Sequence, residues 1–332
     1  QVKIISCAAM ATLPKNGEGT LEEELPHEQL VIFVRHAESR WNRAQAAMSP
    51  IGMMWENDHG LSEEGKLQAE TLRSKLQEAK APLEKADPMD AKEAQWLSRL
   101  LSPDVVYSSP FTRALQTACI GLQDILPKSH LVVLREAREC KRLGGADSTG
   151  VACGEEICQR VREEMSALYE ADSAESAAQI LKELEQISMD TSSVVDEWWG
   201  NVFGETFEEI DENLEALMHR LRRSRGSLAG GGAIAVLVGH SYIIRTIFDA
   251  YLMKGSSAPS QYRSLRSKLI PCCGVVGARI TWDDHGHPVI KEAVPLLNTT
   301  LERPEENDLG GQRASSCTCG RNRMEMPSCV MS

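Results

Sequence analysis

Four short apolar runs in this chain are each followed, at once or within a few residues, by side chains that can bind an anion or move a proton. Imidazole and carboxyl groups take part in proton transfer, and guanidinium groups bind anions through several N–H donors. Each side chain alone has an ordinary structural explanation, but their common position makes a shared site the better hypothesis. The runs are 30–34, 105–107, 131–134 and 233–238, and the residues that follow them are Arg35 with His36, Arg113, Glu136, and His240.

The elements that must position these residues form a repeating pattern. The apolar runs are short and rich in β-branched residues, which is typical of strands buried on both faces of a parallel sheet. Segments with helical spacing lie between them, so the sequence predicts a three-layer α/β/α fold with a mainly parallel central sheet. Ligands bind beyond the carboxyl ends of such strands. The predicted helices are 63–78, 112–126, 155–168, 205–222 and 242–252.

Composition changes mark one folded domain at 27–302. We expect a disordered N-terminal segment, 1–26, because it carries Pro, Gly and an acidic run, and a disordered C-terminal tail, 303–332, because its composition is polar. Two polar stretches, 81–102 and 140–202, interrupt the strand and helix pattern and predict helical insertions, with two helices in the second. The segments 275–282 and 288–293 flank a glycine turn and predict a hairpin.

The composition narrows the classes of partner. The 332 residues carry a net charge of -12, which disfavours nucleic acid and anionic membranes as partners, so any anionic ligand needs a local basic site. No run approaches the roughly 18 apolar residues of a membrane span. Ten cysteines without regular spacing predict reduced thiols and a cytoplasmic, intracellular protein. Because the sequence begins with Gln1, organelle targeting stays open, and so does the oligomeric state.

Four motifs resemble the histidine phosphatase superfamily, in its phosphoglycerate mutase-like group. Arg-His-Ala-Glu-Ser at 35–39, with Asn42, is similar to the R-H-G-E-S-x-x-N signature, with Ala37 where Gly is commonest. Residues 58–69 are similar to the helix start D-x-x-L-T-x-x-G-x-x-Q-A, and 108–118 to the second-arginine segment. The sequence Gly-His-Ser at 239–241 resembles the second-histidine motif. The resemblance spans residues 28–295 and implies the phosphoglycerate mutase-like fold.

The resemblance implies a role for each of these residues. His36 would attack phosphorus and become phosphohistidine, while Arg35, Arg113 and His240 would hold the phosphoryl oxygens. Guanidinium geometry suits bidentate contact with such oxygens. The other ring nitrogen of His36 needs a hydrogen bond, most simply to a backbone carbonyl. No metal and no cofactor are required. The remaining substrate-binding residues implied are Ser39, Asn42 and Ser241, with Asn42 contacting phosphate or fixing the first loop.

The leaving group needs a proton, and the sequence offers two candidates for the general acid. Glu136 follows the third apolar run, directly after Arg135, and is the preferred assignment. Glu139 lies three residues on and is the alternative. Either carboxyl group must have a raised pKa to donate a proton near neutral pH, which burial would favour.

The implied function is metal-independent hydrolysis of phosphomonoesters, with a small phosphorylated metabolite or a phosphoprotein as substrate. Three alternatives stay open. The first is mutase-type phosphoryl transfer, although residues 135–139 match the mutase element Glu-Arg-His-Tyr-Gly poorly. The second is a non-catalytic phosphate-binding module. The third is an α/β-hydrolase with Ser241 as nucleophile, although such an elbow favours Gly at the position of Ile243.

One further segment has two interpretations. Trp198-Trp199-Gly200 followed by Gly204-Glu205-Thr206 resembles a segment of some phosphatase-like members in which Glu205 begins a helix near the site. Core aromatics and an acidic residue in the first turn of a helix explain it equally well.

Overall fold

The computed structural model describes residues 27–54, 56–80, 91–141, 145–170, 172, 174–201, 203–223, 233–255 and 259–303. The predicted disordered segment 1–26 lies outside the described residues. The same holds for the predicted tail 303–332, except for Arg303.

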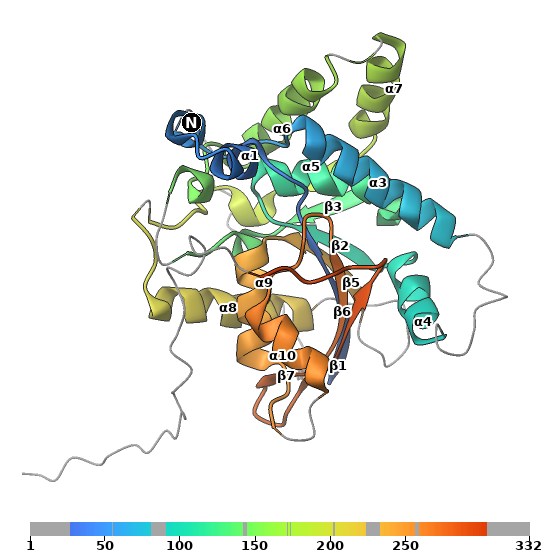
Figure 1. Cartoon of the computed structure of the whole chain (residues 1–332), viewed down its shortest axis with the longest axis vertical. Helices are drawn as coiled ribbons and strands as arrows, with labels where there is room; N and C mark the ends of the chain where they lie inside the picture. Colours follow the sequence, from blue (N-terminus) through green and yellow to red (C-terminus); the bar gives the residue numbers. More distant parts are fainter. Residues whose placement is uncertain are drawn as a thin grey trace, which may run out of the picture.

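A seven-stranded sheet forms the centre of the described part of the chain, in the order β4-β3-β2-β5-β1-β6-β7 (Figure 1). Neighbouring strands from β4 to β1 run parallel, whereas β6 runs antiparallel to β1 and to β7. The predicted mainly parallel sheet and its hairpin are therefore confirmed. The strands are β1 Glu28–Arg35, β2 Val105–Ser108, β3 His130–Val133, β4 Ser188–Asp190, β5 Ile234–Gly239, β6 Val275–Trp282 and β7 Pro288–Leu296.

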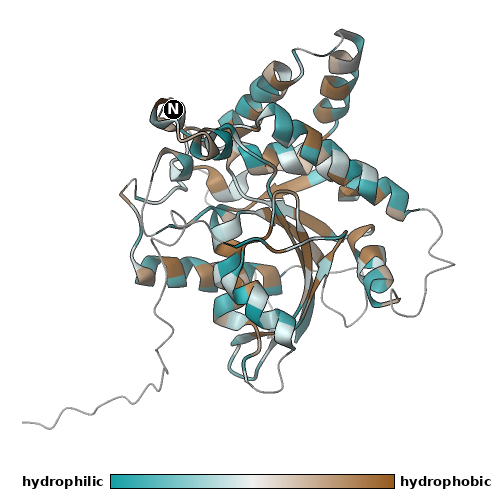
Figure 2. Cartoon of the chain, in the orientation of Figure 1, coloured by the Kyte–Doolittle hydropathy of each residue, from teal (hydrophilic) through white to brown (hydrophobic). Residues whose placement is uncertain are grey.

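The central strands are apolar on both sides because helices cover both faces of the sheet. In β1, Ile32 and Val34 pack into the core on one face, and Val31 and Phe33 into the core on the other. Helices α3, α4, α5 and α6 contribute to the first core, and α8, α9 and α10 to the second. Figure 2 shows the apolar strands at the centre and polar residues on the outer sides of the helices. This arrangement gives three layers.

The helices follow the predicted pattern with local differences. The segment predicted as one helix over 112–126 ends at Gly121 and continues as two 3-10 turns, because Gly121 and Pro127 both disfavour an α-helix. Helix α8 begins at Phe207, because Thr206 and Glu209 form a capping box. The helices are α1 Arg40–Ala46, α2 Pro50–Met54, α3 Glu63–Ala79, α4 Ala91–Leu100, α5 Thr112–Gly121, α6 Glu155–Leu168, α7 Ala174–Glu185, α8 Phe207–Arg222, α9 Ser241–Tyr251 and α10 Ser260–Ser267.

Both predicted insertions contain helices. The first contributes α4, whose Trp96 packs against Gly277 of β6, where a Cβ atom would lie 2.5 Å from the indole. The second contributes α6 and α7, as predicted, and also β4, which extends the edge of the sheet. The sequence did not predict β4, since three residues are too few for a periodic pattern. Helices α1 and α2 were also not predicted.

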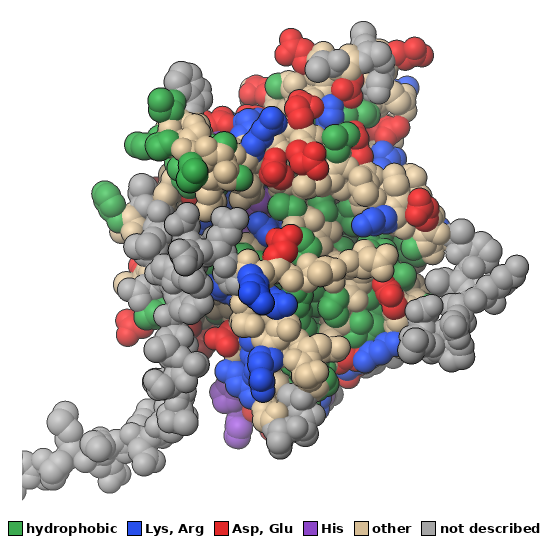
Figure 3. All heavy atoms as spheres, viewed as in Figure 1, with side chains coloured by type: hydrophobic (Ala, Val, Ile, Leu, Met, Phe, Trp, Pro, Cys, Tyr) green, Lys and Arg blue, Asp and Glu red, His purple; other side chains and the backbone are tan. Residues whose placement is uncertain are grey.

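The surface is uneven in charge and polarity. Acidic side chains gather at the end of the molecule formed by α6 and α7, and apolar side chains are exposed around α1 and α2 (Figure 3). Among the latter, Met48, Ile51 and Met54 are largely exposed. No described helix combines the length and apolar character that crossing a membrane requires.

Helix α3 offers a matched test of this packing. Leu72 is buried against α5, and we expect Leu72→Ala to lower the free energy of unfolding by about 2–5 kcal/mol, because it removes buried methyl groups and leaves a cavity. Leu67 on the same helix is exposed, and Leu67→Ala should lower the free energy of unfolding by no more than about 0.5 kcal/mol. Urea unfolding of the two variants measures the difference, and equal losses would contradict the assigned packing.

Candidate functional site

The order of the strands brings the predicted residues together. Strands β3, β2, β5 and β1 are consecutive neighbours and parallel, so their carboxyl ends share one edge. Arg35 pairs with Gly239 in the register, and the amide of His36 donates to the carbonyl of Gly239 over 2.9 Å. His36 and His240 therefore leave the sheet side by side, with ring centroids 5.0 Å apart.

His36 is buried, and its ring is fixed by one hydrogen bond. Nδ1 lies 2.6 Å from the carbonyl oxygen of Ala37. Because a carbonyl oxygen can only accept, Nδ1 must carry the hydrogen, and in the neutral ring Nε2 then keeps its lone pair. This is the backbone contact that the sequence analysis expected.

His240 is fully buried, and its two nitrogens differ. Nε2 lies 2.7 Å from Oγ of Ser109, which follows β2, while Nδ1 has no hydrogen-bond partner in the described part of the chain. Phe111 packs edge-on against the same ring, with centroids 5.4 Å apart. The ring is thus held by neighbours on two sides.

The two arginines are each anchored at one nitrogen and unpartnered at another. Arg35 donates from Nη1 to the carbonyl of Ile270 over 2.7 Å, and Arg113 from Nη2 to the carbonyl of Asp147 over 2.8 Å. Nε of Arg35 and Nη1 of Arg113 are buried without a partner among the described residues. The guanidinium of Arg113 also lies 4.4 Å above the ring of Phe111. We call Arg35, His36, Arg113 and His240 the four-residue cluster.

Electrostatics inside the cluster favour neutral imidazoles. Burial lowers the pKa of His36 well below its usual 6.5, and the nearby charges of Arg113 and Arg35 lower it further. Burial also lowers the pKa of His240, followed by the charge of Arg113 and the neighbouring His36. At neutral pH the two positive charges of the cluster therefore come from the arginines.

The two candidate acids lie in different surroundings. Glu139 is buried, and its Oε1 accepts from the amide of Ile243 over 3.1 Å. Burial raises its pKa, although the charges of Lys141 and Arg113 oppose the rise. Glu136 is half-buried, and one of its carboxylate oxygens is buried without a partner among the described residues. Glu139 is thus within electrostatic reach of the cluster through Arg113, while the assignment of either as the acid stays a prediction.

Sequence analysis missed one cation and its partner. Lys141 is paired with Asp147, whose backbone carbonyl holds Arg113. The charge of Lys141 also contributes to the lowered pKa values of both cluster histidines. The available signal was the spacing of two from Glu139, since alternate residues of an extended segment point to the same side.

The remaining predicted residues lie at the starts of two helices. Ser39 is the N-cap of α1, accepting from the amide of Asn42 over 3.2 Å. Oδ1 of Asn42 in turn accepts from the amide and hydroxyl of Ser39. Of the two roles considered for Asn42, the structure shows it fixing the first loop. Ser241 is the first residue of α9, directly after His240.

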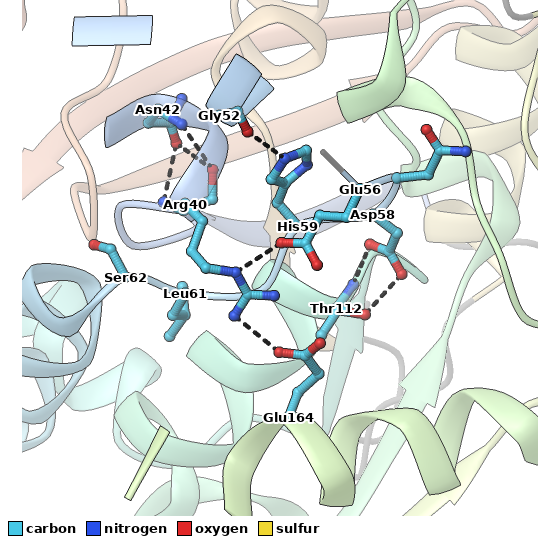
Figure 4. Close-up of polar contacts among 12 residues, drawn as sticks. Arg40, Asn42, Gly52, Glu56, Asp58, His59, Leu61, Ser62, Thr112 and Glu164 are labelled. Atoms are coloured by element: carbon cyan, nitrogen blue, oxygen red, sulfur yellow. Dashed lines mark hydrogen bonds and ion pairs between the residues drawn. The ribbon is translucent and has the colours of Figure 1, made fainter. Parts of the chain in front are cut away.

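A polar network supports the helix that carries Arg113 (Figure 4). Asp58 is buried and accepts from the amide of Thr112 over 2.8 Å and from its hydroxyl over 2.6 Å. Arg160 of α6 lies 3.5 Å from the same carboxylate. Asp58 therefore caps the N-terminus of α5 from a distant part of the chain. A second part of the network joins Arg40 to Glu56 over 2.7 Å and to Glu164 over 2.9 Å, linking α1 to α6.

No family profile and no curated protein sequence matches the chain, but solved structures do. A mycobacterial glucosyl-3-phosphoglycerate phosphatase is 17% identical, with a TM-score of 0.42, over 83% of this chain and 99% of its own. Phosphoglycerate mutase from Bacillus anthracis is 15% identical, with a TM-score of 0.41, over 80% and 93%. Ecdysone phosphate phosphatase from Bombix mori is 14% identical, with a TM-score of 0.41, over 83% and 98%.

At these identities and TM-scores the likeness is too distant to assign an activity. An activity for this chain rests on the geometry of its own site.

The lowered pKa values predict how stability depends on pH. Below pH 6.5 the unfolded chain protonates its histidines, whereas folded His36 and His240 resist protonation, so stability is lost as the pH falls from 6.5 toward the folded pKa values. We expect His240→Gln to lose less stability over this range than the wild-type protein. Urea unfolding between pH 7.5 and 5 measures this loss of stability for each protein. His285→Gln, at an exposed histidine, is the control. Parallel wild-type and His240→Gln profiles would contradict this account.

Proposed function

We propose that this protein hydrolyses phosphomonoesters through a phosphohistidine at His36. The observation that supports the proposal best is the set of buried N–H donors without partners in the four-residue cluster. A buried donor without a partner costs roughly 1–3 kcal/mol. Nε of Arg35 and Nη1 of Arg113 are such donors, and Nδ1 of His240 is a third buried nitrogen without a partner among the described residues. A ligand with several acceptor oxygens explains them best, and a phosphoryl group has three equatorial ones.

The arginines provide the charge that a phosphate dianion requires. Each guanidinium is oriented by a backbone carbonyl, from Ile270 or Asp147, so its remaining N–H groups are preorganised for the ligand. When a dianion enters, it raises the pKa of His240, which then binds a proton and donates it in a further hydrogen bond. Phosphate binding is therefore expected to weaken as the pH rises.

In the first chemical step the lone pair of Nε2 of His36 forms a bond to phosphorus, and the bond from phosphorus to the ester oxygen breaks. The proton stays on Nδ1, which donates its hydrogen bond to the carbonyl of Ala37, and this contact stabilises the charge that develops on the ring. We propose Glu139 as the group that protonates the departing oxygen, because burial favours its neutral form. In the second step water attacks phosphorus, Glu139 takes its proton, and the bond to Nε2 breaks as phosphate leaves.

Two observations favour hydrolysis by this route over the alternatives. In the mutase element the arginine follows the glutamate, whereas Arg138 precedes Glu139 and its guanidinium is engaged with Glu205. Ser241 begins α9 in the described structure without the positive φ of a strained turn. An α/β-hydrolase elbow would also leave the unpartnered arginine donors unexplained. We propose a small phosphorylated metabolite or a phosphoprotein as the substrate.

Replacement of the nucleophile tests the proposal directly. We expect His36→Ala to lower the rate of phosphomonoester hydrolysis by ~10³-fold or more, because no other group accepts the phosphoryl group in line. His130→Gln, at an exposed contact with Ser188, is the control. Quenched turnover of a ³²P-labelled ester should give an acid-labile, alkali-stable label that the His36→Ala variant lacks. Unchanged hydrolysis by this variant excludes His36 as nucleophile.

The general acid can be identified from its dependence on the leaving group. An alkyl phosphate requires protonation of its leaving oxygen, whereas p-nitrophenyl phosphate does not. Glu139→Gln should therefore lower kcat/KM for the alkyl ester by about 10²–10⁴-fold and affect the aryl ester much less. Glu136→Gln is the matched variant and should affect both esters equally. If Glu136→Gln lowered kcat/KM mainly for the alkyl ester and Glu139→Gln affected both esters equally, Glu136 would be the general acid.

A further inference from the structure

The segment 138–141 follows η4 Arg135–Ala137 and includes the start of the second insertion. It carries two sets of side chains on opposite sides. Arg138 and Cys140 lie together, with Nη1 of Arg138 2.6 Å from Sγ of Cys140. Glu139 faces the other way, toward the amide of Ile243, and Lys141 faces Asp147. This alternation is that of an extended segment, and the backbone of Arg138 is extended, with φ -60° and ψ 157°. One side of the segment therefore faces the cluster, and the other side faces away.

Glu205 makes two contacts with this segment, one of them with Arg138 on the side that faces away. Its carboxylate accepts from Nη2 of Arg138 over 2.6 Å and from Nη1 over 3.1 Å, a bidentate pair. Its backbone amide donates to the carbonyl of Lys141 over 2.8 Å. Glu205 thus fixes the segment at both ends, three residues apart, and Glu139 lies between the two contacts.

Glu205 is itself held firmly. Its side chain is 6% exposed and that of Arg138 is 13% exposed, so the pair is largely shielded from solvent. Gly200 lies so close that a Cβ atom there would be 2.7 Å from the carboxylate carbon. On the C-terminal side, the capping box of Thr206 and Glu209 fixes the start of α8. A buried bidentate pair of this kind fixes geometry more than it adds stability.

We propose that Arg138 and Glu205 are positioning residues that hold Glu139 in place for proton transfer at the four-residue cluster. Neither side chain contacts a cluster residue in the described structure, so the effect acts through the backbone of 138–141. This inference rests on the proposed function. It also gives the segment from Trp198 to Thr206 a role beyond core packing.

The test compares two substrates in one variant. Glu205→Gln keeps the shape of the side chain but removes the charge that holds the guanidinium, so Glu139 loses its fixed position. We expect kcat/KM for an alkyl phosphate to fall about ten- to hundredfold relative to that for p-nitrophenyl phosphate. Glu205→Asp keeps the charge, and we expect a smaller shift. Should Glu205→Gln fail to fold, the ratio measured for Glu205→Asp decides, and an unchanged ratio overturns the proposal.

A double-mutant cycle separates positioning from general loss of structure. Once Glu139→Gln has removed the acid, nothing remains to be positioned, so adding Glu205→Gln should change the ratio of the two substrates less than about twofold. If Glu205→Gln instead disturbed the structure in general, its effect on the substrate ratio would remain in the double variant and multiply that of Glu139→Gln. If the two single effects multiply in the double variant, the proposal is overturned.

The control is a second bidentate pair, in which the side chains of Arg73 and Asp124 are 28% and 25% exposed. Arg73 donates to both carboxylate oxygens of Asp124, and Asp124→Asn should leave the substrate ratio unchanged. A shift as large as that of Glu205→Gln would overturn the proposal. If the wild-type protein hydrolyses neither ester, the proposed function fails. If it hydrolyses both but Glu205→Gln keeps the ratio, only the positioning role fails.

Discussion

Buried hydrogen-bond donors without partners are the constraint on which the arrangement of this site depends. Arg35, Arg113 and His240 each bury a nitrogen that finds no acceptor in the described part of the chain. Proteins rarely retain such groups, because each loses its hydration without a compensating bond. Here the groups lie at adjacent strand ends around one histidine, where a phosphoryl group would satisfy them together. Under the proposed function, these fixed donors supply the preorganisation that phosphoryl transfer needs.

The surrounding structure keeps these donors from relaxing. Asp58 caps the helix that carries Arg113, and the carbonyl of Asp147 accepts from the guanidinium itself. His36 is fixed by Ala37, and His240 by Ser109 and the ring of Phe111. Most of these supports are backbone groups or short side chains with few rotamers. They can therefore hold an orientation at little cost in entropy.

Much of the fold could be predicted from sequence, because strand and helix patterns are local. The runs at β1 and β5 are apolar at every position, which both predicted burial on two faces and indicated the central strands. The ends of helices and the shortest strand were predicted less well. Pro127 and Gly121 divide a stretch that reads as one helix, and the three residues of β4 depend on pairing with β3 rather than on their own pattern. The order of the strands also required the tertiary structure.

The sequence by itself determined which residues could form the site, since Arg35, His36, Arg113 and His240 each follow an apolar run that must become a buried strand. Only the tertiary structure decided which carboxyl group lies near them. Glu136 and Glu139 differ by three positions in an irregular segment, where no periodicity tells which side chain faces the cluster. Contacts with Glu205 and Ile243, both distant in sequence, set that orientation. Lys141 and its partner Asp147 were missed because the spacing of two from Glu139 indicates a shared side only in an extended segment, and the tertiary structure decided that this segment is extended.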